Sequence, residues 1–347
     1  MTNTLRTTDR RRPAPARGAR RGLATLAALT LLGGLAACGS GSPSGAAGAE
    51  PATDPDAGPL TAVTVGAIPI GDVAPVHLGK AKGFFEEEGL DLTIEDTTGG
   101  AVAVPGVVAG SYDFAFGNLV SLMVARDKGL DVRYVSNGAS TTGEAGTDFA
   151  AVVVPEDSPI TDPADLEGKT VTSNNLANIG DTAIRATVDR EGGDGSQLTF
   201  VEMAFPDAFG ALESGQVDAA LILEPFLTPA LDQGGRAVLW PYAGTHERLD
   251  IGGYFSTGER IDQEPETAAA FAAAMERSLA YAQEHPDEVR ETIGTYTKTD
   301  PELLERIRLP RFAPEFSRDA AAELGRAAVR YGTLADEPDL DALLPAE

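Results

Sequence analysis

The chain has 347 residues, of which 42% are hydrophobic, and it carries a formal net charge of −26. This length suits two domains with sizeable cores, and the composition excludes disorder throughout. Because so acidic a surface repels phosphate backbones and anionic lipid headgroups, we exclude nucleic-acid binding. The same self-repulsion favours a monomer.

The N-terminus is typical of an export signal. Clusters of arginine at 10–12 and 20–21 precede an apolar run at 23–35 that is too short for a permanent membrane span. The run leads into Leu-Ala-Ala-Cys at 35–38. This motif resembles the lipobox of bacterial lipoproteins, in which the cysteine is acylated and becomes the first residue after cleavage. Export by the general or by the twin-arginine route stays open, because one arginine pair is weak evidence.

Cys38 is the only cysteine of the chain, which excludes a disulfide framework and a structural zinc site built on thiolates. Its expected role is the lipid anchor. We therefore predict a lipoprotein signal peptide over residues 1–37 and a flexible tether rich in Gly, Ser, Ala and Pro over 38–60. The expected location is the extracytoplasmic face of the cell membrane.

From residue 61 onwards the chain alternates strand and helix patterns. Residues 61–68, 90–96 and 112–117 are typical of strands, and helices are expected at 75–88 and 102–109, each ending at a glycine. Such alternation predicts parallel sheets, whose ligands lie beyond the carboxyl ends of the strands.

The pattern recurs at a nearly constant offset. Thr64 and Val65 match Thr170 and Val171 at an offset of 106 residues. Three further pairs match at an offset of 105: Gly110 with Gly215, Asp113 with Asp218, and Ala115 with Ala220. We infer two similar βαβ lobes that face each other across a ligand cleft.

Residues 149–154 are typical of a buried strand, and Pro155 follows them, so we expect the chain to cross from one lobe to the other there. A return crossing is expected near 252–255. This assigns 61–150 plus 251–347 to lobe I and 151–250 to lobe II. Beyond residue 264 the pattern is strongly helical, and these helices are expected to cover lobe I.

Residues 80–90, Lys-Ala-Lys-Gly-Phe-Phe-Glu-Glu-Glu-Gly-Leu, resemble a sequence block of substrate-binding lipoproteins of ABC importers. The family is the nitrate, taurine and alkanesulfonate group, which includes binding proteins for thiamine-pyrimidine precursors. Its other blocks have counterparts at 110–118, 178–181, 205–207, 215–220 and 224–226. The resemblance covers nearly all of residues 61–345. It implies an α/β fold of the periplasmic-binding-protein type II, which closes on a small-molecule ligand and docks on an ABC permease powered by its ATPase. No cofactor and no metal is expected.

Polar and aromatic side chains at the predicted strand ends are the candidate ligand contacts. The stretch 170–181 ends a strand in small amides and opens a helix whose first N–H groups lack intrahelical partners. The offset pairs this stretch with 68–75. The candidates are Asp72, His77, Thr98, Asn118, Ser121, Asn174, Asn175, Asn178, Phe205 and Glu224.

Glu224 is the most informative candidate. A carboxylate in the cleft would repel nitrate or a sulfonate and attract an amine or a protonated ring. The predicted loops offer little Arg or Lys to offset it, so a simple anion would rely on backbone N–H groups. Five aromatic residues could stack on a ring or pack in the core: Phe116, Phe205, Phe209, Phe226 and Tyr254. The ligand stays open between a taurine-, alkanesulfonate- or nitrate-like solute and a heteroaromatic vitamin precursor.

Two other function classes stay open. A surface sensor, or a ligand-binding lipoprotein not coupled to import, would have the same sequence features. An extracellular enzyme is less favoured, because the chain has three histidines and neither a G-x-S-x-G nor an H-E-x-x-H motif. We therefore name no catalytic residue.

Overall fold

The computed structural model describes residues 58–346. The predicted signal peptide, Cys38 and nearly all of the predicted tether lie outside this range. Within it, no helix combines the length and the apolarity that crossing a membrane requires.

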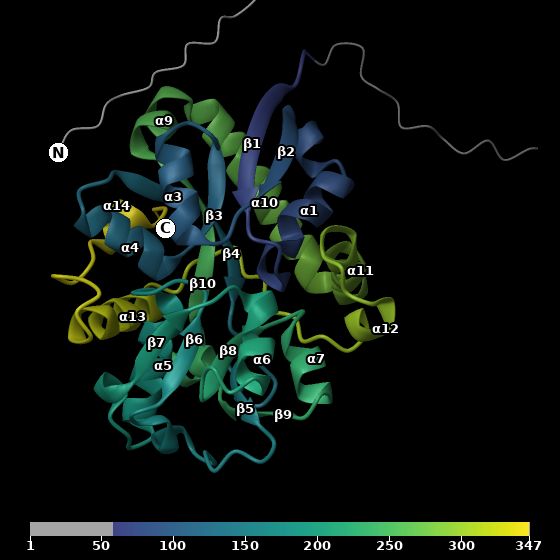
Figure 1. Ribbon diagram of the computed structural model, residues 1–347. Coiled ribbons are helices and arrows are strands. Elements are labelled where there is room, and N and C mark those ends of the chain that lie inside the picture. Colours follow the sequence, from purple (N-terminus) through teal and green to yellow (C-terminus); the bar gives the residue numbers. More distant parts are fainter. Residues whose placement is uncertain (1–57, 347) are drawn as a thin grey trace, which may run out of the picture. The chain divides into compact units, whose positions relative to one another are not determined.

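The strands form two five-stranded sheets, which carry lobe I and lobe II (Figure 1). The sheet of lobe I has the order β2-β1-β3-β10-β4, with β1 (Thr61–Ala67), β2 (Leu90–Asp96), β3 (Phe114–Asn118), β4 (Val132–Ser140) and β10 (Asp250–Thr257). The sheet of lobe II has the order β7-β6-β8-β5-β9, with β5 (Ala150–Pro155), β6 (Thr170–Ser173), β7 (Thr199–Glu202), β8 (Ala219–Leu223) and β9 (Gly235–Leu239). The chain passes from the first sheet to the second after β4 and returns with β10.

The internal repeat is visible in both sheets. The parallel strands β2-β1-β3 have the same order as β7-β6-β8. Asp113 accepts a hydrogen bond from the backbone N–H of Thr64 at 2.6 Å, and Asp218 accepts the equivalent bond from Thr170 at 2.8 Å. Each aspartate therefore ties the start of the third strand of its lobe to the first strand, at the middle of β1 and at the start of β6.

The prediction of parallel sheets is confirmed for the three βαβ strands of each lobe and is wrong for the two remaining strands of each sheet. β10 pairs antiparallel with β3 and β4, and β5 pairs antiparallel with β8 and β9. Each of these two strands follows directly on a crossing between the lobes, so it enters its sheet in the opposite direction. Both sheets are consequently mixed.

The predicted helix at 75–88 is divided into α1 (Ala74–Ala81) and α2 (Phe84–Glu87). Gly83 lies between them with φ = 79°, a left-handed conformation that ends the first helix. A short 3-10 helix, η1 (Gly71–Val73), precedes α1. It carries Asp72 into the space beyond the end of β1.

The other helices cover the faces of the two sheets. In chain order they are α3 (Gly100–Val108), α4 (Leu119–Asp127), α5 (Ile179–Arg190), α6 (Phe205–Glu213), α7 (Leu227–Asp232), α8 (Pro241–Thr245), α9 (Gly258–Gln263), α10 (Pro265–Glu284), α11 (Pro286–Tyr296), α12 (Pro301–Leu304), α13 (Arg318–Arg330) and α14 (Leu340–Leu343). Two further 3-10 turns are η2 (Pro163–Leu166) and η3 (Gly195–Gln197). As predicted, the segment after residue 264 is mainly helical, and α10 packs on α1 and β4 of lobe I.

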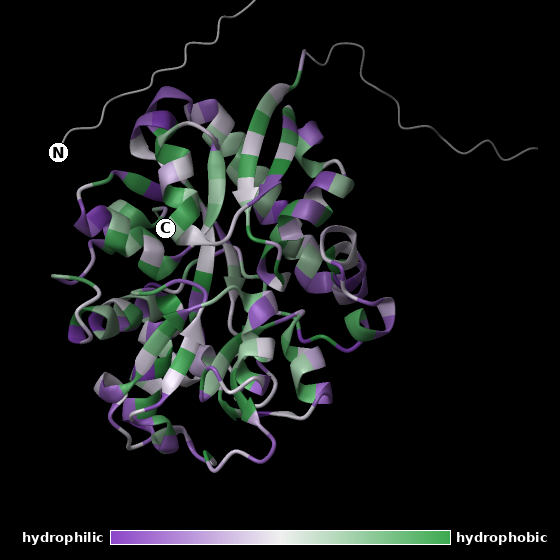
Figure 2. Cartoon of the chain, viewed as in Figure 1, coloured by the Kyte–Doolittle hydropathy of each residue, from purple (hydrophilic) through white to green (hydrophobic). Residues whose placement is uncertain are grey.

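Apolar residues concentrate in the strands of both sheets (Figure 2). In lobe I, Phe271 of α10 stacks on Phe114 of β3 with ring centroids 4.2 Å apart, and it also contacts Phe85 and Tyr254. All four side chains are buried. Burying such a ring stabilises the fold by roughly 1.5–3 kcal/mol, so α10 anchors the sheet that holds one half of the site.

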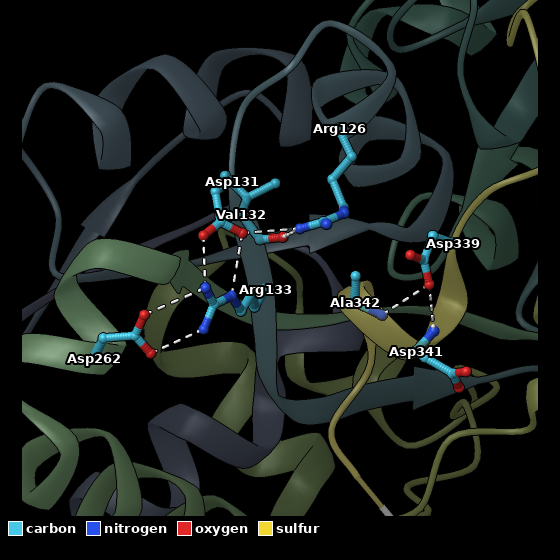
Figure 3. Close-up of polar contacts among 8 residues, drawn as sticks. All are labelled: Arg126, Asp131, Val132, Arg133, Asp262, Asp339, Asp341 and Ala342. Atoms are coloured by element: carbon cyan, nitrogen blue, oxygen red, sulfur yellow. Dashed lines mark hydrogen bonds and ion pairs between the residues drawn. The ribbon is translucent and has the colours of Figure 1, made fainter.

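A surface network fixes the beginning of β4 (Figure 3). Arg133 pairs with Asp131 at 2.7 Å and with Asp262 at 2.9 Å, and Arg126 donates to Asp131 at 3.0 Å. The same view shows Asp339 capping α14. Exposed ion pairs of this kind contribute roughly 0–1 kcal/mol each, so the network positions the strand more than it stabilises the lobe.

Candidate functional site

A small cavity lies where the strands of the two lobes end, with a volume of about 30 Å³. Thirteen residues line it. They are Ile68, Ile70, Asp72, Gly99, Gly100, Phe116 and Asn118 from lobe I, Asn174, Ile179, Phe205, Leu223 and Tyr242 from lobe II, and Ile251 of β10. Because ligand pockets commonly hold about 300–1,000 Å³, the lobes must separate, or wall side chains must move, to admit an organic solute.

Four helices begin at this cavity. Gly100 opens α3, Asn118 caps α4, Ile179 opens α5 and Phe205 opens α6. The arrangement follows from the βα connections, because a helix that leaves a parallel strand starts at the carboxyl edge of the sheet. The combined helix dipoles give the walls a partial positive charge.

Two asparagine amides connect the lobes beside the cavity. Asn118 Nδ2 donates to Asn178 Oδ1 at 2.6 Å, and Asn178 Nδ2 donates to Ser121 Oγ at 2.8 Å. Each asparagine also caps its own helix: Asn118 accepts from the N–H of Ser121, and Asn178 accepts from the N–H of Ile179. We call Asn118, Ser121 and Asn178 the amide bridge. All three were predicted as ligand contacts, and the structure brings them together as a buried contact between the lobes.

Asp72 is the charged residue of the cavity wall. Its side chain is fully buried, and neither carboxylate oxygen accepts a hydrogen bond from another residue. Burial raises its pKa to about 7, its own backbone N–H opposes that rise, and the nearby Asp148 carboxylate adds to it. A carboxylate in this position is stabilised as an ion by a cationic partner or by further hydrogen-bond donors.

Glu224 does not line the cavity, contrary to the expectation that it would meet the ligand. One carboxylate oxygen accepts from Thr228 Oγ1 at 2.6 Å and from the N–H of Arg308 at 3.2 Å, and the other accepts from the N–H of Thr228 at 3.1 Å. The Arg308 guanidinium lies 3.5 Å away. Glu224 therefore joins lobe II to the segment after α12. Burial raises its pKa, and the hydrogen bonds from Thr228 and Arg308 oppose this.

Two further candidates point elsewhere. His77 stacks on Tyr296 of α11 with ring centroids 4.0 Å apart, because its helix turns this face toward α11 rather than the cavity. Burial, followed by the charge of Lys80, lowers the pKa of His77 to about 4. Thr98 is exposed, and the wall at this loop is made by the backbone of Gly99 and Gly100 instead. Neither His77 nor Thr98 is among the residues that line the cavity.

The amides after β6 divide into two kinds. Asn174 lines the cavity, whereas Asn175 is buried next to it with no partner for its Oδ1. Both face Gly99 of the other lobe, where an added Cβ would lie 2.6 Å from Asn175 Oδ1 and 3.0 Å from Asn174 Nδ2. Gly99 has φ = 133°, so the close approach of the lobes depends on a residue without a side chain.

Aromatic and aliphatic side chains complete the walls. Of the five aromatic candidates, Phe116 and Phe205 line the cavity, whereas Phe209, Phe226 and Tyr254 pack in the lobe cores. Tyr242 and Ile251 also line the cavity but were not predicted from the sequence, and they flank the return crossing to lobe I. These two residues lie outside the repeated strand-end loops, so the offset could not indicate them.

Two α/β lobes with matching strand orders, joined by two crossings around a cavity at their strand ends, define a solute-binding fold of the periplasmic-binding-protein type. Residues 71–289 match the family described as NMT1/THI5 like. This match spans more than half of the chain, and the protein belongs to that family.

Similar proteins include a Bacillus subtilis protein named for the binding of aliphatic sulfonates, which is 23% identical over 240 residues that cover 68% of this chain and 70% of the relative. The alkanesulfonate-binding protein SsuA of Xanthomonas axonopodis, solved with MOPS, has a TM-score of 0.69 at 17% identity and covers 83% of this chain and 99% of that one. The nitrate-binding protein NrtA of Synechocystis PCC 6803 has a TM-score of 0.67 at 14% identity, with coverages of 82% and 86%. These structural likenesses support the fold.

Proposed function

We propose that this protein is the solute-binding subunit of an ABC importer. It captures a small organic nutrient between its lobes and delivers it to a membrane permease driven by an ATPase. The observation that carries this proposal is the cavity at the strand ends, which takes its walls from both lobes and has the amide bridge at its side. Family membership, and relatives named for binding sulfonates and nitrate, support it.

The arrangement suits capture and release rather than chemistry. The wall combines one carboxylate and two amides with a mainly apolar lining, and such a surface orients a ligand without providing a nucleophile and base within reach of each other. The relatives named above are binding proteins. We accordingly propose that the solute leaves unchanged.

The proposal includes a lipid anchor at Cys38 and a location on the extracytoplasmic face of the cell membrane. The sequence of residues 35–38 supports the anchor. We further propose that the protein works as a monomer, because its high negative charge opposes self-association.

Ligand-dependent thermal stabilisation tests the binding function. The full-length chain, purified in mild detergent, is heated with taurine, ethanesulfonate, nitrate or 4-amino-2-methylpyrimidine. A ligand at a hundred times its dissociation constant adds about 2.7 kcal/mol to the free energy of unfolding, which raises Tm by several degrees. We also expect each probe to remain chemically unchanged after prolonged incubation with the protein. Conversion of any probe would contradict a pure binding role.

Metabolic labelling with a fatty acid tests the anchor. Label is expected on the wild-type chain and absent from Cys38→Ala. Ser40→Ala, two residues further on, serves as a matched control that keeps the label. Labelled Cys38→Ala protein would refute the anchor while leaving the solute-binding function untouched.

A further inference from the structure

Asp72 differs from every other buried carboxylate of the described chain. Residues 58–346 bury five carboxylates: Asp72, Asp148, Asp181, Glu224 and Asp250. Four of them accept at least three hydrogen bonds each from backbone or side-chain donors. Asp72 accepts none from any other residue with either oxygen, and the one nearby donor is its own backbone N–H. A buried ionic group without partners is costly, so this exception calls for a partner that comes from outside the chain.

The protein supplies no cation at this place. The thirteen residues that line the cavity include no Lys, Arg or His. Arg308, at the same side of the molecule, is occupied by Glu224 and lies over the ring of Trp240 at 5.8 Å. The carboxylate therefore faces a cavity with no positive side chain to offset it.

Helix N-termini at the cavity favour an anion and have to be weighed against Asp72. Each carries about half an elementary charge, which falls off within the first turn. Asn118 and Asn178 already cap two of these helices and accept from their first N–H groups. In its ionised form, the Asp72 carboxylate carries a whole charge inside the cavity wall, and this charge outweighs such partial charges for any ligand group placed next to it.

We propose that Asp72 is a ligand-binding residue and that the ligand presents a protonated nitrogen to it, as a primary ammonium or a protonated aminopyrimidine does. This inference rests on the proposed solute-binding function and specifies the chemical class of the solute. A protonated nitrogen makes short, charge-assisted hydrogen bonds to a carboxylate. Phe116, Phe205 and Tyr242 provide the apolar surface for the alkyl or ring portion of the ligand.

The ionisation of Asp72 agrees with this assignment. Burial is the main cause that raises its pKa to about 7; its own backbone N–H opposes the rise, and the Asp148 carboxylate contributes to it. The other titratable groups that interact with it are Tyr242, Tyr254 and Tyr296, each with a pKa raised by burial. None of these neighbours offers a positive charge near neutral pH, whereas a bound ammonium would restore the ionised form of Asp72.

Isothermal titration with matched probes tests the inference. The full-length chain in mild detergent is titrated with two pairs: taurine against ethanesulfonate, and 4-amino-2-methylpyrimidine against 2-methylpyrimidine. In at least one pair, the member with the basic amine is expected to bind about tenfold or more tightly, because a charge-assisted bond is lost with the amine. Asp72→Asn should weaken that probe by about the same factor.

Asp113→Asn is the matched control, since this carboxylate lies at the opposite end of the sheet, on the N–H of Thr64 and on Arg260. It is expected to leave the affinity for each probe within about threefold, because Asp113 does not line the cavity. Two results would overturn the inference without contradicting the proposed solute-binding function. In the first, the amine-free member of every pair that binds has the higher affinity. In the second, Asp72→Asn binds the amine probe with the full affinity of the wild-type chain. If no probe binds the wild-type chain, both the inference and the proposed function fail for these solute classes.

Discussion

The substitution Asp72→Asn measures, in the absence of ligand, how much the buried carboxylate lowers the free energy of unfolding. Burial raises the pKa of Asp72 from 3.8 to about 7. The folded state therefore disfavours the ionised carboxylate relative to the unfolded chain. This penalty is absent below pH 3.8, grows as pH rises toward 7, and is fully present above that value. An amide of the same shape carries no charge and removes the penalty.

The size of the effect follows from the pKa values. The gap between 3.8 and about 7 corresponds to about 4 kcal/mol, at roughly 1.4 kcal/mol per pH unit. This is an upper value, because separation of the lobes would let water reach the carboxylate and lower its pKa. We expect Asp72→Asn to raise the free energy of unfolding at pH 8 by about 2–4 kcal/mol more than at pH 4. Comparing the two pH values cancels the cost of burying a neutral polar group, which the amide and the protonated acid share.

Urea unfolding of the full-length chain, followed by circular dichroism at pH 4, 6 and 8, measures this difference. Asp148→Asn is the matched control, because Asp148 is equally buried and accepts hydrogen bonds from Thr141, Thr142, Phe149 and Ala243. Its replacement leaves partners unsatisfied and is expected to destabilise the fold by about 1–3 kcal/mol. If Asp72→Asn changed the free energy of unfolding equally at pH 4 and pH 8, or lowered it at pH 8, the conclusion that the carboxylate has no partner would be refuted.

Three further changes probe the elements around the cavity. Glu224→Gln should lower the free energy of unfolding by about 1–3 kcal/mol, measured in urea, because it weakens the contact with Arg308; a selective loss of amine binding would instead place Glu224 at the ligand. Asn178→Ala should remove a helix cap and both bonds of the amide bridge. We expect it to weaken probe affinity about tenfold and to enlarge the radius of gyration measured by X-ray scattering. Unchanged affinity and an unchanged radius of gyration would show that the bridge does not hold the lobes together. Gly99→Ala should weaken probe affinity in titration, because its Cβ would lie 2.6 Å from an amide oxygen of the other lobe. The control is Gly110→Ala, because Gly110 also has a positive φ but has open space around it, and this variant should keep its affinity. Equal losses of affinity in the two variants would indicate backbone strain alone.

The regular part of the fold could be predicted because its signals are local. Alternating strand and helix patterns located β2 at its observed bounds, and the offset of 105 to 106 residues identified two lobes with the same strand order. The offset also paired Asp113 with Asp218, whose hydrogen bonds are equivalent in the two sheets. The antiparallel direction of β5 and β10 could not be predicted, because strand direction depends on how the chain crosses between lobes.

The candidate site was predictable only in part, for a related reason. The strand-end loops hold Asp72, Asn118, Asn174 and Phe205, and all four line the cavity. Glu224 occupies an equivalent loop, yet its partner Arg308 lies 84 residues further along the chain. No local pattern indicates a contact of such long range, so the charge of Glu224 looked uncompensated in the sequence.

The repeat makes the contrast between Asp72 and Asn178 informative. Each lies five residues after the end of the first strand of its lobe, β1 or β6, so the two lobes present equivalent positions to the cleft. Asn178 has donors and acceptors that are satisfied by the other lobe and by its own helix. Asp72 takes no part in holding the lobes together, and above neutral pH its charge lowers the stability of the closed arrangement. A protonated nitrogen placed against Asp72 would turn that penalty into attraction, so such a ligand would favour closure while a simple anion would oppose it. The same carboxylate would thereby select the solute and couple its binding to the closed lobes.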